Sequence, residues 1–251
     1  MKIRRILVSQ PKPADAKSPY FELAESNNVH IDFRQFIHVE GLDVKEFRKQ
    51  KVDILAHTAV VFTSKTAIDH FFRLCEELRV SIPETMKYFC VSESISVYLQ
   101  KYIIYRKRKI FSGPSGKFPD MIDVMKKHKD EKFLVALSDI HKQEIPDLLD
   151  KYKFTYTKAV FYKTVSSDLS DININDYDML VFFSPQGILS LKHNFPDFVQ
   201  GEVKIGTFGG STAQAVREAG LRLDVPAPTP EAPSMTMALD QFIKKFNKGQ
   251  K

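Results

Sequence analysis

Short apolar runs bounded by turn-forming residues alternate along this chain with longer segments whose apolar positions recur at helical spacing. In the segment 66–78, for example, Ile68, Phe71, Cys75 and Leu78 share one face of a helix. Such alternation is typical of parallel sheets covered by helices. It predicts strands at 3–8, 31–36, 59–63, 88–91, 133–137, 154–160, 179–183 and 204–208, and helices at 66–78, 94–101, 118–127, 143–151, 187–193, 212–219 and 232–246.

Length and composition favour two globular α/β domains. A chain of 251 residues is long enough for its core to divide, because single cores usually split above ~200 residues. A hydrophobic content of 43% with 27% charged residues is ordinary for a globular protein. No apolar run approaches the ~20 residues that span a bilayer, so we expect no membrane partner.

An internal repeat supports the division into two domains. Residues 60–64 parallel residues 180–184, so that Ser64 corresponds to Ser184, and residues 89–94 parallel residues 206–211. Each block reads as a strand, a small polar turn and the start of a helix. Because two blocks recur in the same order at nearly one offset, we interpret them as a duplicated unit.

The repeated turns are candidate anion sites. In a parallel sheet, ligands bind beyond the carboxyl ends of strands, where unpaired N–H groups and the helix dipole favour carboxylate or phosphate. For each hydroxyl, the alternative role is simple capping of the first helical turn. The turns carry Thr63, Ser64, Ser92, Ser94, Ser184, Ser211 and Thr212.

Charge and motifs narrow the function further. The net charge of +6 favours an anionic partner. Residues 101–109 are strongly basic with interleaved tyrosines, which leaves a nucleic-acid-binding role as an alternative. No nucleic-acid-binding motif accompanies them, so a solvated strand and loop is the favoured interpretation and nucleic acid is disfavoured as a partner.

Other residue types point away from metal and disulfide chemistry. Phosphate-loop, dinucleotide, serine-hydrolase and zinc-protease motifs are all missing from the sequence. The seven histidines lack ligand spacing, so we expect no metal. Cys75 and Cys90 lie in apolar runs, which predicts buried free thiols and a cytoplasmic location.

Several short segments occur in an order that resembles the uroporphyrinogen-III synthase family. They are Val-Phe-Thr-Ser at 61–64, Val-Phe-Tyr-Lys-Thr at 160–164, Phe-Phe-Ser-Pro-Gln-Gly at 182–187, Phe-Gly-Gly-Ser-Thr-Ala at 208–213 and Pro-Thr-Pro-Glu-Ala at 228–232. The resemblance implies two similar flavodoxin-like, doubly wound parallel-sheet domains with an interdomain cleft. One domain would comprise 1–36 plus 165–251 and the other 41–160, joined by linker strands at 37–40 and 161–164.

The resemblance also implies an activity. The family cyclises the linear tetrapyrrole hydroxymethylbilane to uroporphyrinogen III, inverting ring D and losing water, in porphyrin biosynthesis. This implies a lyase that uses no cofactor, acts as a monomer and binds a substrate with eight carboxylates. Tyr162 would be the proton donor, although a packed linker tyrosine is an equal alternative. The implied substrate-binding residues are Thr63, Ser64, Lys65, Ser92, Ser94, Ser138, Ser184, Gln186, Gly210, Ser211, Thr212 and Thr229.

One turn departs from the family pattern. Where the family usually has Gly-x-x-Thr, this chain has Ser92, Glu93, Ser94 and Ile95, so the threonine donor is replaced by Ile95. Either Ser94 substitutes for it or that contact is absent. Glu93 would also repel a bound carboxylate unless it points away or pairs with a base. The departure leaves open a non-catalytic tetrapyrrole- or anion-binding module of the same fold.

Overall fold

Two largely parallel β-sheets organise the chain in a computed structural model that describes residues 2–249. Each sheet lies mainly in its own compact unit. Unit 1 comprises the residues up to His38 and those from Val165 onward, and unit 2 comprises Val39–Thr164. The predicted α/β class with two parallel-sheet domains is confirmed.

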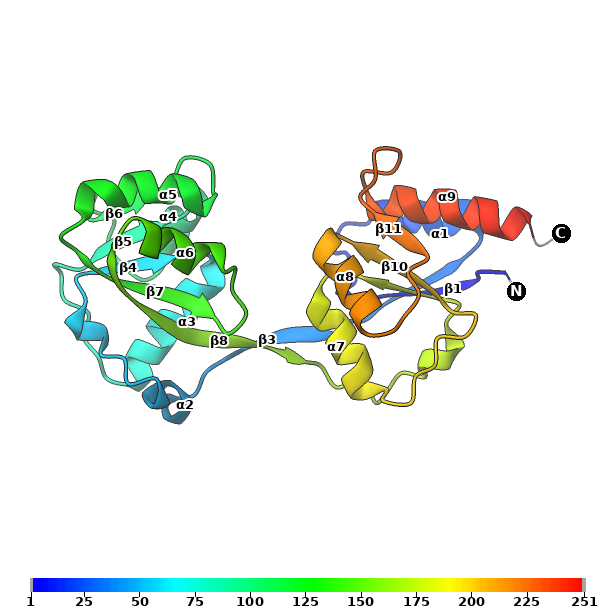
Figure 1. The fold of residues 1–251 in the computed structure, drawn as a ribbon, viewed down its shortest axis with the longest axis horizontal. Coiled ribbons are helices and arrows are strands. Elements are labelled where there is room, and N and C mark those ends of the chain that lie inside the picture. Colours follow the sequence, from blue (N-terminus) through cyan, green and yellow to red (C-terminus); the bar gives the residue numbers. More distant parts are fainter. Residues whose placement is uncertain (1, 250–251) are drawn as a thin grey trace. The chain divides into compact units, whose positions relative to one another are not determined.

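Unit 1 is a five-stranded sheet covered on both faces. Its order is β11 (Val225–Ala227), β10 (Lys204–Phe208), β9 (Met179–Phe182), β1 (Arg5–Val8) and β2 (His30–Phe33), with every neighbouring pair parallel. Figure 1 shows α1 (Pro19–Asn27) beside α9 (Met235–Lys248) on one face, and α7 (Pro185–Asn194) with α8 (Gly210–Glu218) on the other. Alternation along β1 explains the two layers, because Ile6 packs with the first pair of helices and Leu7 with the second.

Unit 2 contains a six-stranded sheet whose core includes several buried phenylalanines. Its order is β3 (Ile37–Gly41), β8 (Thr155–Ser166), β7 (Lys132–Ser138), β4 (Ala59–Phe62), β5 (Lys87–Cys90) and β6 (Ile110–Ser112). Its helices are α2 (Val44–Lys49), α3 (Lys65–Glu77), α4 (Glu93–Leu99), α5 (Phe118–Met125) and α6 (Glu144–Lys151). Short 3-10 helices lie at Ile54–Ala56 and Lys126–His128, and a third, Ile174–Asp176, lies in unit 1. Phe62, Phe89 and Phe133 are fully buried in the core.

Five strands have the same spatial order in the two units, but the chain passes through them in a different sequence. The order β11-β10-β9-β1-β2 of unit 1 corresponds to β6-β5-β4-β7-β8 of unit 2. The repeated blocks fall on corresponding strands, with β9 matching β4 and β10 matching β5. Each sheet therefore has one topological switch point, between β9 and β1 in unit 1 and between β4 and β7 in unit 2. Switch points are where open α/β sheets bind ligands.

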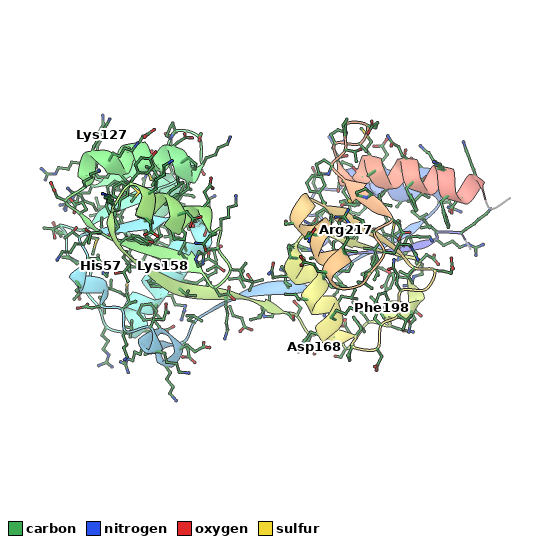
Figure 2. All side chains as sticks on the ribbon, viewed as in Figure 1. His57, Lys127, Lys158, Asp168, Phe198 and Arg217 are labelled. Carbon is green, nitrogen blue, oxygen red and sulfur yellow. The ribbon has the colours of Figure 1, made fainter. Side chains whose placement is uncertain are left out.

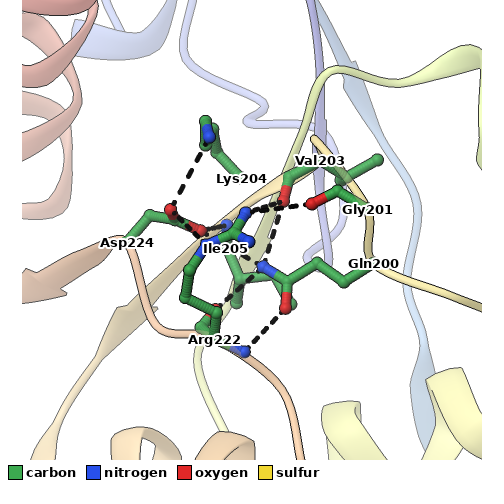
Figure 3. Close-up of polar contacts among 7 residues, drawn as sticks. All are labelled: Gln200, Gly201, Val203, Lys204, Ile205, Arg222 and Asp224. Atoms are coloured by element: carbon green, nitrogen blue, oxygen red, sulfur yellow. Dashed lines mark hydrogen bonds and ion pairs between the residues drawn. The ribbon is translucent and has the colours of Figure 1, made fainter.

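Polar anchors hold the opposite, amino-terminal end of the unit 1 sheet. Figure 3 shows Asp224 accepting hydrogen bonds from the Ile205 N–H at 2.9 Å and from Arg222 Nε at 2.9 Å. Elsewhere in unit 1, Arg34 donates to the carbonyl of Asp168, which is labelled in Figure 2, at 3.0 Å. The Asp224 contacts connect a loop to the amino-terminal end of β10, whereas Arg34 directly follows β2 at the carboxyl end of that strand. Within residues 2–249, no helix is long and apolar enough to cross a membrane.

Candidate functional site

The switch point of unit 2 carries a cavity of about 450 Å³. Thr63, which follows β4, Ser138, which ends β7, and Tyr162 of β8 all line it. The structure thus brings together three of the predicted site residues from three neighbouring strands. All residues around this cavity belong to unit 2.

Tyr162 is tied to the first repeated turn. Its side chain is buried, and its hydroxyl lies 3.1 Å from Ser64 Oγ. Ser64 also caps α3, because its Oγ accepts a hydrogen bond from the Ala67 N–H at 3.0 Å. Because one lone pair of Ser64 Oγ accepts the Ala67 N–H, the Ser64 hydroxyl can donate a hydrogen bond to the phenol oxygen of Tyr162. The Tyr162 proton is then available to a ligand in the cavity.

The imidazole of His70 stacks on the ring of Tyr162, with ring centroids 5.5 Å apart. Burial, and then the nearby Arg73 guanidinium, lower the pKa of His70 below its ordinary value. The imidazole is therefore neutral at pH 7, and it holds the phenol ring in place without adding a charge beside it.

A hydrogen-bonded turn fixes the wall formed after β7. The Ser138 hydroxyl donates to Asp139 Oδ1 at 2.9 Å, and that carboxylate also accepts the Thr164 N–H of β8 at 3.1 Å. His141 Nδ1 lies 3.0 Å from the carbonyl oxygen of Ser138, so Nδ1 carries a proton and donates it. The Nε2 atom of His141, a lining residue, is left for other partners.

Four charged or titratable residues around the cavity were missed by the sequence analysis: Lys117, His141, Lys142 and Glu144. A usable signal exists for both lysines. Lys117 ends a Gly-Pro-Ser-Gly-Lys loop directly before a predicted helix, and Lys142 lies between a predicted strand and helix. In a parallel sheet, such positions lie at the ligand-binding edge.

The second repeated turn of unit 2 does not line this cavity. Ser92 begins α4 without making a side-chain cap, and its Oγ lies 3.0 Å from Oγ of the exposed Ser94. Ile95, at the departure from the family pattern, is buried in the hydrophobic core. Lys65 is exposed, with Nζ 5.4 Å from the ring centroid of Tyr98.

The candidate residues of unit 1 lie at the carboxyl ends of three adjacent strands. Ser184 caps α7 by accepting the Gly187 N–H at 3.2 Å, as Ser64 caps α3. Gln186 follows in the first turn of α7 and is half-buried. A Cβ on Gly187 would lie 3.8 Å from the hydroxyl of Ser9, which the sequence analysis missed. Ser9 directly follows β1, so it and Ser184 flank the switch point of unit 1.

The start of α8 is open to solvent. Gly209 precedes it with φ 97°, a left-handed conformation that favours glycine, and provides no side-chain cap. Gly210 and Ser211 are exposed, whereas Thr212 is buried. After β11, Thr229 Oγ1 accepts the Ala232 N–H at 3.1 Å. The Thr229 hydroxyl is therefore engaged within its own loop, whereas the first residues of α8 are exposed.

The basic stretch 101–109 is an irregular segment before β6, and two of its charges are paired. Lys101 Nζ lies 3.6 Å from Asp69, and Arg106 lies 3.0 Å from Glu84. Within residues 2–249, no cluster of His, Cys, Asp or Glu side chains is placed to hold a metal ion.

Comparisons with known proteins agree on one family. The family model described as uroporphyrinogen-III synthase HemD matches residues 29–237. The uroporphyrinogen-III synthetase of Helicobacter pylori has a similar structure, with a TM-score of 0.55 and 15% identity over 99% of this chain and 100% of that chain. A mutant uroporphyrinogen III synthase from Thermus thermophilus gives 0.50 and 13% over 98% of each chain. At these identities the two structures show the fold alone. No curated protein sequence matches the chain.

Proposed function

Because the chain belongs to the uroporphyrinogen-III synthase family, we propose that it cyclises hydroxymethylbilane to uroporphyrinogen III. In reaction class this makes it a cyclising hydro-lyase. The observation that supports the chemistry is the unit 2 cavity, where Tyr162 and Ser64 bring a proton donor to the ligand-binding edge of the sheet.

The reaction begins at the terminal hydroxymethyl group of the bilane. Its C–O bond breaks as a proton is delivered and water leaves, while the pyrrole nitrogen supplies the electron pair. The cationic carbon then bonds to the already substituted α-carbon of ring D, which gives a spiro intermediate. The older bond to that carbon breaks, the released fragment bonds to the free α-carbon of ring D, and a proton is lost there. Oxidation states balance without an external oxidant or reductant.

In this proposal Tyr162 transfers a proton to the departing hydroxyl. Ser64 orients the phenol by donating a hydrogen bond to the phenol oxygen. The phenolate can later accept the proton lost from ring D. Spontaneous closure gives the uninverted isomer, so the enzyme must mainly hold the bilane in the geometry for the less accessible attack.

The predicted turn residues remain proposed substrate contacts. Thr63, Ser64 and Ser138 would act at the unit 2 cavity. Exposed N–H groups at Gly210 and Ser211 favour carboxylate binding. Lys65, Ser92, Ser94, Ser184, Gln186, Thr212 and Thr229 complete the proposed set. Because Ile95 packs in the core, its presence gives no argument for a binding-only module.

Two further properties belong to the proposal. Cys75 and Cys90 are free and buried, and burial raises the pKa of each to about 12, which fits a reducing compartment such as the cytoplasm. One chain carries every residue assigned a role, so we propose that it acts as a monomer.

The product isomer tests the function. Freshly prepared hydroxymethylbilane is incubated with the purified chain, and the oxidised porphyrins are separated by chromatography. We expect the type III isomer in amounts that grow with enzyme concentration. Type I product alone, at the rate of the enzyme-free reaction, would contradict the assignment and favour a binding-only module.

A further inference from the structure

Two lysines beside the unit 2 cavity have no side-chain partner within the part of the chain that the structure describes. Lys117 and Lys142 both line it and are exposed. Among the described residues, neither ammonium group forms an ion pair or a side-chain hydrogen bond. Glu144 is the one acidic lining residue, so the fixed charges around the cavity sum to a positive value. Such a rim favours an anion.

Two open helix starts converge on the same cavity. Lys117 is the N-cap position of α5 and Gln143 that of α6, and neither makes a side-chain cap. The first residues of both helices, Phe118 and Glu144, line the cavity. The backbone dipoles of two helices thus add positive potential to that of the lysines.

Two acids in the first turns of these helices, Asp120 and Asp147, have hydrogen-bond partners of their own. Ser115 donates to Asp120 in the first turn of α5, and Gln143 donates to Asp147 in the first turn of α6 at 2.9 Å. Neither carboxylate is paired with Lys117 or Lys142, and Glu144 is the one acid that lines the cavity with the two lysines.

The walls and size suit one ring of the substrate. Val91, Phe118, Leu137 and Ile145 give the cavity an apolar surface against which a flat ring can pack. Its volume of about 450 Å³ lies in the lower part of the ~300–1,000 Å³ range of small-molecule pockets. A linear tetrapyrrole is too large for it, whereas one pyrrole with two acidic arms is of suitable size.

We propose that this cavity holds the pyrrole ring that bears the hydroxymethyl group, with its acetate and propionate arms bound by Lys117 and Lys142. The inference rests on the proposed function, in which Tyr162 protonates the hydroxyl group on that ring. Tyr162 lines the same cavity. The lysines then select substrate by its carboxylates, and they fix the leaving group beside its proton donor.

A monopyrrole that carries one acetate and one propionate arm is the direct probe. Its affinity is measured by calorimetry at low salt for the wild type, Lys117→Gln, Lys142→Gln and the double variant. We expect the dissociation constant to rise about tenfold for each single change, since a charge-assisted hydrogen bond is lost, and further for the double variant. Lys127→Gln, an exposed lysine labelled in Figure 2, is the charge-matched control and should bind as the wild type.

Two results would overturn the inference: unchanged binding by the double variant, or an equal loss in Lys127→Gln. Circular dichroism melting checks that each variant is folded. With the full substrate, the double variant should raise KM more than it lowers kcat, because ground-state binding is what the lysines supply.

The experiments distinguish a failure of the inference from a failure of the proposed function. If the wild type forms type III product but the double variant binds the monopyrrole normally, the cavity assignment is wrong and the function stands. If monopyrrole binding depends on the lysines but only type I product forms, the function is wrong and the cavity stands.

Discussion

The hydroxyl of Tyr162 can be removed with little damage to the fold. In Tyr162→Phe the ring stays in place, stacked on His70. The lost hydrogen bond, 3.1 Å long in the structure, leaves Ser64 Oγ still bonded to the Ala67 N–H. One hydrogen bond contributes about 1 kcal/mol, so we expect the free energy of unfolding to fall by no more than about that amount.

The catalytic effect should be much larger. A positioned general acid contributes about 10²–10⁴-fold, which corresponds to about 3–5 kcal/mol of transition-state stabilisation. Because the proton is transferred only in the transition state, kcat and kcat/KM should fall together while KM changes little. Positioning by the cavity remains intact, so residual type III product is expected.

Initial rates of isomer formation and a urea denaturation curve, measured on the same preparation, give both quantities. Tyr156→Phe is the matched control, because Tyr156 also lies on β8 but donates to Asp150 outside the cavity. It should keep the wild-type rate. An unchanged turnover in Tyr162→Phe would refute the assignment of Tyr162 as proton donor.

Three further changes test other parts of the structure. Ile95→Thr restores the residue usual in the family, but at a core position, so we expect a loss of about 1–3 kcal/mol in the free energy of unfolding and no gain in kcat/KM. Asp224→Ala leaves the buried Ile205 N–H unpaired and should cost about 2–4 kcal/mol of stability by urea denaturation, with kcat/KM retained. His70 has its pKa lowered in the folded state, so its contribution to stability is present above the unfolded pKa of ~6.5 and is lost as pH falls through the folded value. The urea midpoint should therefore fall less between pH 7.5 and 5.5 in His70→Gln than in the wild type, and an equal fall in both would show that His70 is not responsible.

The strands were predictable because parallel strands buried on both faces read as continuous apolar runs. All eight predicted strands occur, and the repeat led directly to the matching caps Ser64 and Ser184. Strands β6 and β11 were missed because each has only three residues, and β11 contains a proline. Helix α1 was missed because its apolar stripe is weak, with Leu23 its only buried residue among those described.

The site was harder to predict because its contacts are tertiary. Ser64 and Tyr162 lie 98 residues apart in the sequence. They meet in the fold because a single strand, β7, lies between β4 and β8 in the sheet. Lys117 and Lys142 reach one cavity from loops that follow different strands. Local periodicity identifies each strand but does not encode the order of the strands in the sheet. The sequence therefore identified hydroxyl-bearing turns and missed the lysines beside them.

Ring inversion itself can be measured by following two carbons of the substrate. Hydroxymethylbilane is labelled with ¹³C at the hydroxymethyl carbon and at the substituted α-carbon of ring D, and the enzymatic product is examined by NMR. Attack through the spiro intermediate joins these two carbons, so we expect a one-bond ¹³C–¹³C coupling in the product. A product without that coupling would mean that the ring closed without inversion, which would contradict the assigned activity.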